Sequence, residues 1–309
     1  MVSIKSVKQR IKSVKNTAQI TKAMEVVSAT KMRRSQEFAL QARPYAVASL
    51  ELLANLLERS NIMPDLLTSR EVHTTAMLII TSDKGLAGAF NSNIIKKIEA
   101  LIAQKQKNSN TIMLITVGKK IKDYAEHRNF NIAKSFWGFG DYTMPEETLP
   151  VADFLIKGFL NRSFDEVIVV YTHFRTTLLQ ETLVKKVLPA DTLSLEQAIK
   201  SIIPEHGRFS TTRKPEPYER YNFEYIFEPS AKEILDSLIP QLIRMQVHHI
   251  LLESNASEHS ARMVAMKSAS DNAGELIDTL SIAYNKARQS SITQELTEIT
   301  AGREALENE

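Results

Sequence analysis

The chain has 309 residues, of which 43% are hydrophobic and 24% are charged, and its formal net charge at pH 7 is +3. These values are normal for a globular protein with one large domain or two ordinary ones. The absence of cysteine excludes disulfides, thiolate metal sites, a cysteine nucleophile and a thiol redox switch. No run approaches the roughly 18–20 consecutive apolar residues that a membrane-spanning helix needs.

The first predicted element is a long helix from Val2 to about Arg59, which has no glycine and only one proline, Pro44. About 55 residues at 1.5 Å each would make a rod of roughly 80 Å. Its apolar residues recur at alternating spacings of three and four, which places them on one seam. The seam residues are Ile4, Val7, Ile11, Val14 and Ala18.

This helix also carries a stripe of basic charge. Residues 2–24 contain no acidic residue but six basic ones, and three more follow at Lys31, Arg33 and Arg34. Such a stripe can simply solvate a helix, but it also suits an acidic partner surface, whether protein, phospholipid or nucleic acid. The same basic, acid-poor start also fits a mitochondrial transit peptide. The six residues are Lys5, Lys8, Arg10, Lys12, Lys15 and Lys22.

The middle of the chain, about residues 70–215, alternates short apolar runs with helical segments. Strands are predicted at 76–81, 111–118 and 166–174, and helices at 91–105 and 149–159. This alternation predicts an α/β domain with a mostly parallel sheet covered by helices.

The segment TSDKGLAGAFN, Thr81–Asn91, follows a strand and opens a helix, where α/β proteins bind phosphates. Its glycines, Gly85 and Gly88, have the spacing G-x-x-G, which matches neither nucleotide-binding fingerprint. The structural interpretation is a tight turn, with Asn91 or Ser92 capping the helix. The histidines show no metal-binding or catalytic spacing, so the sequence offers no catalytic constellation.

The last predicted element is a helix that begins near Pro229 and continues to the C-terminus, interrupted only by Pro240, Gly274 and Gly302. About 75 residues would make a rod of roughly 110 Å. A seam of 3-4 spacing with many small residues predicts close packing against another helix. Its members are Met263, Met266, Ser270, Ala273, Ile277, Leu280, Tyr284, Ala287 and Ser291.

Together these patterns predict a coiled-coil pair of the N- and C-terminal helices, with an α/β domain inserted between them. The predicted segments are residues 1–60, 70–215 and 216–309. Two long helices could simply close one domain, but helices of this length exceed what the α/β domain can cover. We therefore expect a protruding stalk with a mechanical or connective role.

Three blocks of sequence resemble the gamma subunits of F-type ATP synthases, in the same order and over almost the whole chain. The first is VKNTAQITKAMEVVSATKMRRSQ, Val14–Gln36, and the second is the turn Thr81–Asn91. The third and most specific is Ser257–Gly302, which contains the run ITQELTEI, Ile292–Ile299.

The resemblance implies a rotor shaft, a long antiparallel coiled coil of the N- and C-terminal helices with an inserted Rossmann-like α/β domain. The coiled coil would enter a hexamer of alternating alpha and beta subunits. It implies an α/β domain near the membrane, beside the epsilon subunit and the ring of c subunits, with one copy of the chain per complex. ATP chemistry would belong to beta, so this chain would be non-catalytic and would bind no cofactor and no nucleic acid. Without a clear presequence, we expect a bacterial protein, peripheral to the cytoplasmic side of the plasma membrane.

The resemblance also assigns contacts with the beta subunit. Arg288 and Gln289 match the family's pair at the beta catch loop, and Thr293 matches a nearby contact position. Met24 matches the position close to beta's acidic lever, and Lys31 and Arg33 lie just beyond it.

One departure from the family is the charged tail GREALENE, residues 302–309, which replaces a usually apolar ending. Two other functions stay open from the residues alone: an enzyme that binds a nucleotide at the turn containing Gly85 and Gly88, and a coiled coil that binds nucleic acid. The second predicts affinity that falls steeply with salt.

Overall fold

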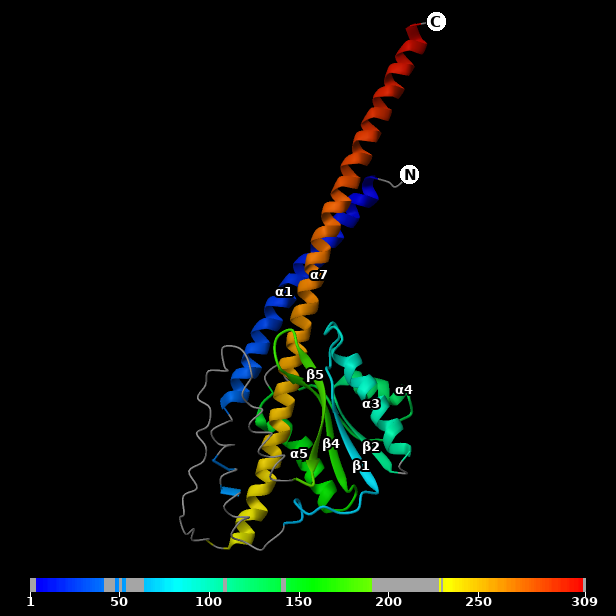
Figure 1. Cartoon of the computed structure of the whole chain (residues 1–309). Coiled ribbons are helices and arrows are strands. Elements are labelled where there is room, and N and C mark those ends of the chain that lie inside the picture. The colour runs from blue at the N-terminus through cyan, green and yellow to red at the C-terminus, as the bar shows by residue number, and fades with distance from the viewer. Residues whose placement is uncertain are drawn as a thin grey trace. The chain divides into compact units, whose positions relative to one another are not determined.

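The computed structural model describes residues 4–41, 48–49, 52–53, 64–107, 110–139, 143–190, 228 and 230–307. Long helices at both ends flank a strand–helix region, which confirms the predicted fold class (Figure 1). In chain order the elements are α1 (Ile4–Gln41), β1 (Thr74–Ile80), α3 (Phe90–Lys107), β2 (Thr111–Val117), α4 (Lys119–His127), β3 (Ile132–Phe136), α5 (Pro145–Leu160), β4 (Glu166–Phe174), β5 (Gln180–Leu188) and α7 (Ala231–Glu307).

The chain divides into two compact units. One contains Met1–Val27 and Met263–Glu309, and the other contains Ser28–Arg262. Helices α1 and α7 therefore contribute to both units. The segment boundaries predicted near residues 60 and 215 lie outside the described residues.

The larger unit is built on a five-stranded sheet in the order β3-β2-β1-β4-β5. Strand β1 pairs in parallel with β2 and β4, β2 pairs in parallel with β3, and β5 is antiparallel to β4. The prediction of a mostly parallel sheet is confirmed. The order places β1 and β4 side by side near the centre. The chain adds β2 and β3 on one side of β1 and then β4 and β5 on its other side, so the strand order reverses between β1 and β4.

Helices cover both faces of this sheet, so its central strands are mostly apolar and buried (Figure 1). Strand β1 divides its side chains between two cores, as its two-residue period requires. Met77 and Ile79 pack with α3 and α4, whereas Leu78 and Ile80 pack with α5 and α7. Residues 231–262 of α7 thus belong to the core of the larger unit.

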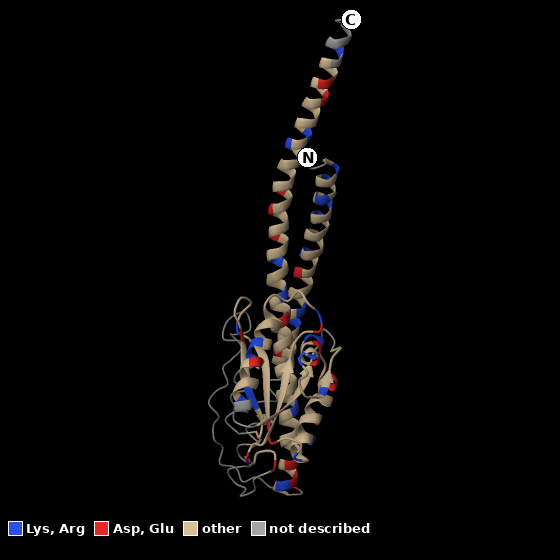
Figure 2. Cartoon of the chain, turned by 90° about the vertical axis from the view of Figure 1, so that its right-hand side faces the viewer, with Lys and Arg blue, Asp and Glu red and all other residues tan. Residues whose placement is uncertain are grey.

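The smaller unit is an antiparallel pair formed by the first part of α1 and the last part of α7 (Figures 1 and 2). The buried and half-buried residues of α1 include all five seam residues predicted from the sequence. All nine predicted seam residues of α7 are likewise buried or half-buried, and Met266 and Ala273 are the least exposed. The 3-4 periodicity therefore predicted the packing faces of both helices.

Several boundaries differ from the prediction. Helix α1 is described only as far as Gln41, so it has 38 residues, and the predicted continuation through 42–47 lies outside the described residues. Helix α7 has 77 residues and runs through Pro240 and Gly274 without ending. At Pro240, buried neighbours such as Ile239 and Ile243 hold it against the core. Strands β3 and β5 and helix α4 were not predicted.

Candidate functional site

The turn after β1, residues 81–89, caps the start of α4. The amide groups of residues 119, 120 and 121 donate to Asp83 Oδ1, Ser82 O and Thr81 Oγ1 at 2.9, 3.2 and 3.1 Å, respectively. The first free N–H groups of a helix are those that bind phosphate in α/β proteins. Here the chain's own turn already occupies those three groups.

The glycine that ends β2 makes this arrangement possible. Gly118 has φ 98°, and a Cβ at this position would lie 2.2 Å from the carbonyl oxygen of Thr81. The second carboxylate oxygen of Asp83 accepts from the Gly138 amide at 2.8 Å. The turn is therefore tied to the ends of both β2 and β3.

The two predicted glycines lie in this turn. Gly88 takes a positive φ of 56°, whereas Leu86, which is 64% exposed, takes the other left-handed position with φ 65°. The predicted helix cap is wrong: Asn91 lies inside α3, and its amide oxygen accepts from the Ser82 amide at 3.1 Å. The Asn91 side chain thus holds the turn and does not cap the helix.

Helix α7 passes the carboxyl ends of β1 and β4, where doubly wound proteins bind their ligands. Arg262 donates to the Gly85 carbonyl at 3.4 Å, and Ser257 Oγ donates to the Thr172 carbonyl at 3.0 Å. Ser260 Oγ donates to the Thr177 carbonyl in the β4–β5 hairpin at 2.9 Å. The crevice that would receive a dinucleotide is occupied by the chain's own helix.

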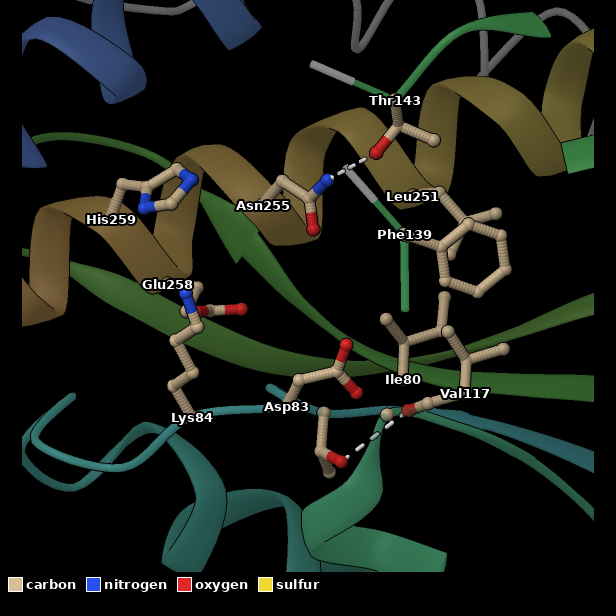
Figure 3. Close-up of a pocket in the computed structure, with 12 residues that line it drawn as sticks. Ile80, Asp83, Lys84, Val117, Phe139, Thr143, Leu251, Asn255, Glu258 and His259 are labelled. Carbon is tan, nitrogen blue, oxygen red and sulfur yellow. Dashed lines mark hydrogen bonds between the residues drawn. The ribbon is translucent and has the colours of Figure 1, made fainter. Parts of the chain in front are cut away.

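A small polar cavity remains beside this helix (Figure 3). Asp83 and Lys84 enter it from the turn, and Asn255 and Glu258 enter it from α7. Its volume is about 90 Å³, whereas ligand pockets typically measure about 300–1,000 Å³. This cavity is too small for a nucleotide.

A wider cavity of about 530 Å³ lies between the end of α1, the start of α5 and α7. Its lining is mostly apolar, and four of its polar side chains, those of Thr143, Thr148, Arg244 and His248, are engaged within the chain. Arg244 Nε donates to Asp153 at 2.8 Å, and His248 Nδ1 lies 3.1 Å from Thr148 Oγ1. Such a lining offers no converging polar groups to orient a substrate.

The histidines of α7 are structural. Burial lowers the pKa of His248 to about 4 and also lowers the pKa of His249. His249 is 7% exposed, and neither of its ring nitrogens has a hydrogen-bond partner among the described residues. The described residues also contain no group of three potential metal ligands.

A buried network that was not foreseen joins β4 to α7. The Glu253 carboxylate contacts His173 Nδ1 and accepts from the Tyr171 hydroxyl group. Burial, reinforced by Glu253, raises the pKa of Tyr171. Because these groups face each other across a packed interface, they fix α7 on the sheet.

Comparison with known proteins decides the family. The family model described as ATP synthase matches residues 3–306. ATP synthase gamma chains from Gloeothece citriformis and Roseiflexus castenholzii are each 40% identical; the alignments cover 99% of this chain and 100% and 99% of those proteins. The chain belongs to the ATP synthase gamma chain family.

Solved structures have the same fold. A chain of the Euglena gracilis mitochondrial ATP synthase aligns with a TM-score of 0.64 at 16% identity, covering 98% of this chain and 94% of that chain. A chain of the central stalk and c-ring structure from Tetrahymena thermophila aligns with a TM-score of 0.56 at 23% identity, covering 81% and 99%. The resemblance seen in the sequence is thereby confirmed.

The partner-contact residues predicted for this gamma chain lie on exposed or half-exposed helix faces. On α7, Arg288, Gln289 and Thr293 are exposed, and Thr293 Oγ1 donates to the Gln289 carbonyl one turn earlier at 2.9 Å. On α1, Arg33 is exposed, whereas Met24 and Lys31 are half-buried. These faces are accessible to another subunit, and the assignment to beta stays a prediction.

The basic stripe of this gamma chain also faces outward. All six lysines and arginines among residues 4–24 are exposed, and no acidic residue occurs among them (Figure 2). Arg262 and Glu253 are two residues that the sequence analysis did not single out. The contacts of Arg262 with Gly85 and of Glu253 with Tyr171 and His173 join residues more than 75 positions apart, and no local sequence pattern indicates such contacts.

Proposed function

We propose that this chain is the non-catalytic central shaft of an F-type ATP synthase and couples proton flow through a membrane ring to ATP synthesis or hydrolysis on beta subunits. The observation that carries the proposal is its full-length match to ATP synthase gamma chains. Chains of similar fold belong to the central stalk and c-ring of the Tetrahymena thermophila enzyme and to the rotor of the Euglena gracilis enzyme. The helix pair supplies the extended element that such a role needs.

The end of α7 supports a role inside a partner assembly. Every residue from 292 to 301 is exposed, including the apolar Ile292, Leu296 and Ile299, which are 46%, 59% and 68% exposed. Single exposed apolar residues are normal, but a row along one helix end fits a surface that other chains surround. A moderate exposed apolar area also suits a rotating shaft. Each Å² of apolar surface that the shaft buried against its partners at one rotation angle would stabilise that angle by about 25 cal/mol.

The proposed partners are three alpha and three beta subunits, the epsilon subunit and the ring of c subunits, with one copy of this chain per complex. Arg288, Gln289 and Thr293 would meet the beta catch loop, and Met24, Lys31 and Arg33 would face its acidic lever. Exposed ion pairs are individually worth about 0–1 kcal/mol. Torque would therefore depend on the shape and stiffness of the shaft more than on any one pair.

The proposed location is the cytoplasmic side of a bacterial plasma membrane, with attachment through the complex. Among the described helices, none has the length and apolar character needed to cross a bilayer. The proposal includes no cofactor, because nucleotide would be bound by the partner subunits. The filled crevice beside β1 and β4 supports this assignment over a nucleotide-binding enzyme.

Co-purification tests the proposal. An affinity tag inserted in the exposed turn at residues 161–163 keeps both helix ends free. After gentle solubilisation of the host membranes, we expect one copy of this chain with three alpha-like and three beta-like chains and with Mg-ATPase activity. Recovery of the chain alone, or with nucleic acid that salt removes, would contradict the proposal.

A further inference from the structure

One segment of α7, residues 255–262, is held by polar contacts on two opposite sides. Asn255 Nδ2 donates to Thr143 Oγ1 at 2.7 Å, and Arg262, seven residues later on the same side, donates to the turn carbonyls (Figure 3 shows the Asn255 contact). Ser257 and Ser260 donate to β4 and to its hairpin. At about 100° per residue, these serines point about 140–160° away from Asn255.

The Arg262 guanidinium carries most of the contacts on the first side. It is 7% exposed, forms an ion pair with Glu258 at 2.6 Å and lies 3.4–3.5 Å from the carbonyl oxygens of Gly85 and Lys84. Its fourth partner is His259 Nδ1 at 3.3 Å. A buried guanidinium is costly unless its donors are satisfied, so its position is tightly specified.

These contacts differ in kind from the packing that precedes them along α7. Residues such as Leu242 and Val247 are buried in the apolar core, and apolar packing has no directional requirement of its own. Hydrogen bonds weaken steeply when the donor turns away from the acceptor. Rotation of α7 about its own axis would therefore break the contacts on both sides at once.

We propose that Asn255, Ser257, Ser260 and Arg262 form a helix lock that fixes the rotational angle and the axial position of α7 on the sheet. The inference rests on the proposed function for its consequence: a locked helix transmits torque between the α/β domain and the shaft. Arg262 is a positioning residue that acts through the turn at Lys84 and Gly85.

Hydrogen exchange on the full chain tests the lock directly. Arg262→Met keeps the apolar stem and removes every donor, so exchange of the Ser82 and Phe90 amides, which donate to Asn91 and Ala87 within the turn, should become about tenfold faster. Lys267→Met is the matched control, because Lys267 is an exposed cation on the same helix. Arg262→Lys, which keeps the charge for Glu258 but loses the planar fork, should give an intermediate rate.

A disulfide rescue tests the mechanical role in the assembled complex. The chain has no cysteine, so Thr177→Cys with Ser260→Cys supplies the only thiols of this subunit. We expect Arg262→Met to keep ATP hydrolysis while losing at least half of the ATP-driven proton pumping per ATP hydrolysed. Oxidation of the cysteine pair in the Arg262→Met chain should restore pumping, and reduction should remove it again.

The outcomes separate the two proposals. Exchange of the Ser82 and Phe90 amides in Arg262→Met that equals the Lys267→Met rate overturns the lock, whatever the complex does. Faster exchange with unchanged coupling limits Arg262 to a local structural role and overturns torque transmission. A wild-type chain that joins no ATPase complex contradicts the proposed function, while the exchange experiment still decides the lock.

Discussion

The two parts of α7 have the same backbone and different surroundings. Residues 231–262 pack in the core of the larger unit through large side chains such as Leu235, Leu242 and Ile243, all at most 1% exposed. Residues 263–291 pack along a narrow seam, and beyond Ser291 every described side chain is exposed. One continuous helix therefore serves as a core element in one unit and as an exposed element in the other.

The comparison teaches that side-chain size, not periodicity, decides how firmly a helix is fixed. Both parts of α7 repeat at helical spacing, but the seam of the smaller unit uses Ser270, Ala273 and Ala287. Small residues allow close approach but bury little apolar area. Each Å² of buried apolar surface contributes only about 25 cal/mol to the stability. The larger unit is thus expected to account for most of the stability of the chain.

The largest expected effect contrasts two isoleucines of α7. Ile243→Ala should lower the free energy of unfolding by about 2–5 kcal/mol, because Ile243 is fully buried. Ile282→Ala should change it by less than about 0.5 kcal/mol, because Ile282 is 71% exposed. Urea denaturation followed by circular dichroism measures both, and equal losses would contradict the comparison.

The next effect concerns pH. His248 has a pKa of about 4 in the folded chain, lowered by burial and by His249 and partly opposed by Glu146, against 6.5 when unfolded. Between pH 6.5 and 4, His248 is protonated in the unfolded chain and mostly neutral in the folded chain. The free energy of unfolding therefore falls as the pH decreases from 6.5 towards 4. The expected loss is about 1–3 kcal/mol.

His248→Asn is the matched variant, since an amide can still bond Thr148 but does not titrate. Its stability should depend less on pH between 6.5 and 5, measured by urea denaturation at each pH. An equally steep dependence in wild type and variant would assign the acid sensitivity to other groups.

A smaller effect is expected at the turn after β1. Thr81→Val removes the oxygen that accepts from the third amide of α4, which should cost about 0.5–2 kcal/mol. Ser92→Ala, at an exposed position whose hydroxyl bonds only the adjacent turn of its own helix, is the control. Thermal unfolding should separate the two, and matching melting temperatures would contradict the capping role.

The smallest effect on stability is expected from removal of Gln294–Glu309. The described side chains of this segment are exposed, so the α/β domain should stay folded with nearly unchanged stability. Coupling of ATP hydrolysis to ion transport should weaken in membranes that contain the truncated chain. Unchanged coupling would contradict a shaft role for this end of α7.

Periodicity and apolar runs predicted the seams and the central strands, because burial of one or both faces of an element requires apolar residues at a regular spacing in the local sequence. Strands β3 and β5 were missed because they are edge strands: IAKSF and QETLVKKVL mix polar and apolar residues. The cap from Thr81 to α4 and the contact of Arg262 with Gly85 join distant parts of the chain. Such tertiary contacts leave no local pattern in the sequence.

The family resemblance supplied the function that local patterns could not. Composition and spacing predicted a stalk and no catalytic centre, but they left the partner open among protein, phospholipid and nucleic acid. The contacts assigned to Met24, Lys31, Arg33, Arg288 and Gln289 are with other chains, so contacts within this chain do not indicate them.

Direct observation of rotation tests the central claim. Because the chain has no cysteine, Lys96→Cys on the exposed face of α3 gives a single attachment point for a bead within this subunit. With the alpha and beta subunits fixed to a surface, the account predicts ATP-driven rotation of the bead in one direction. A bead that stays at one angle while the same complexes hydrolyse ATP would contradict the account.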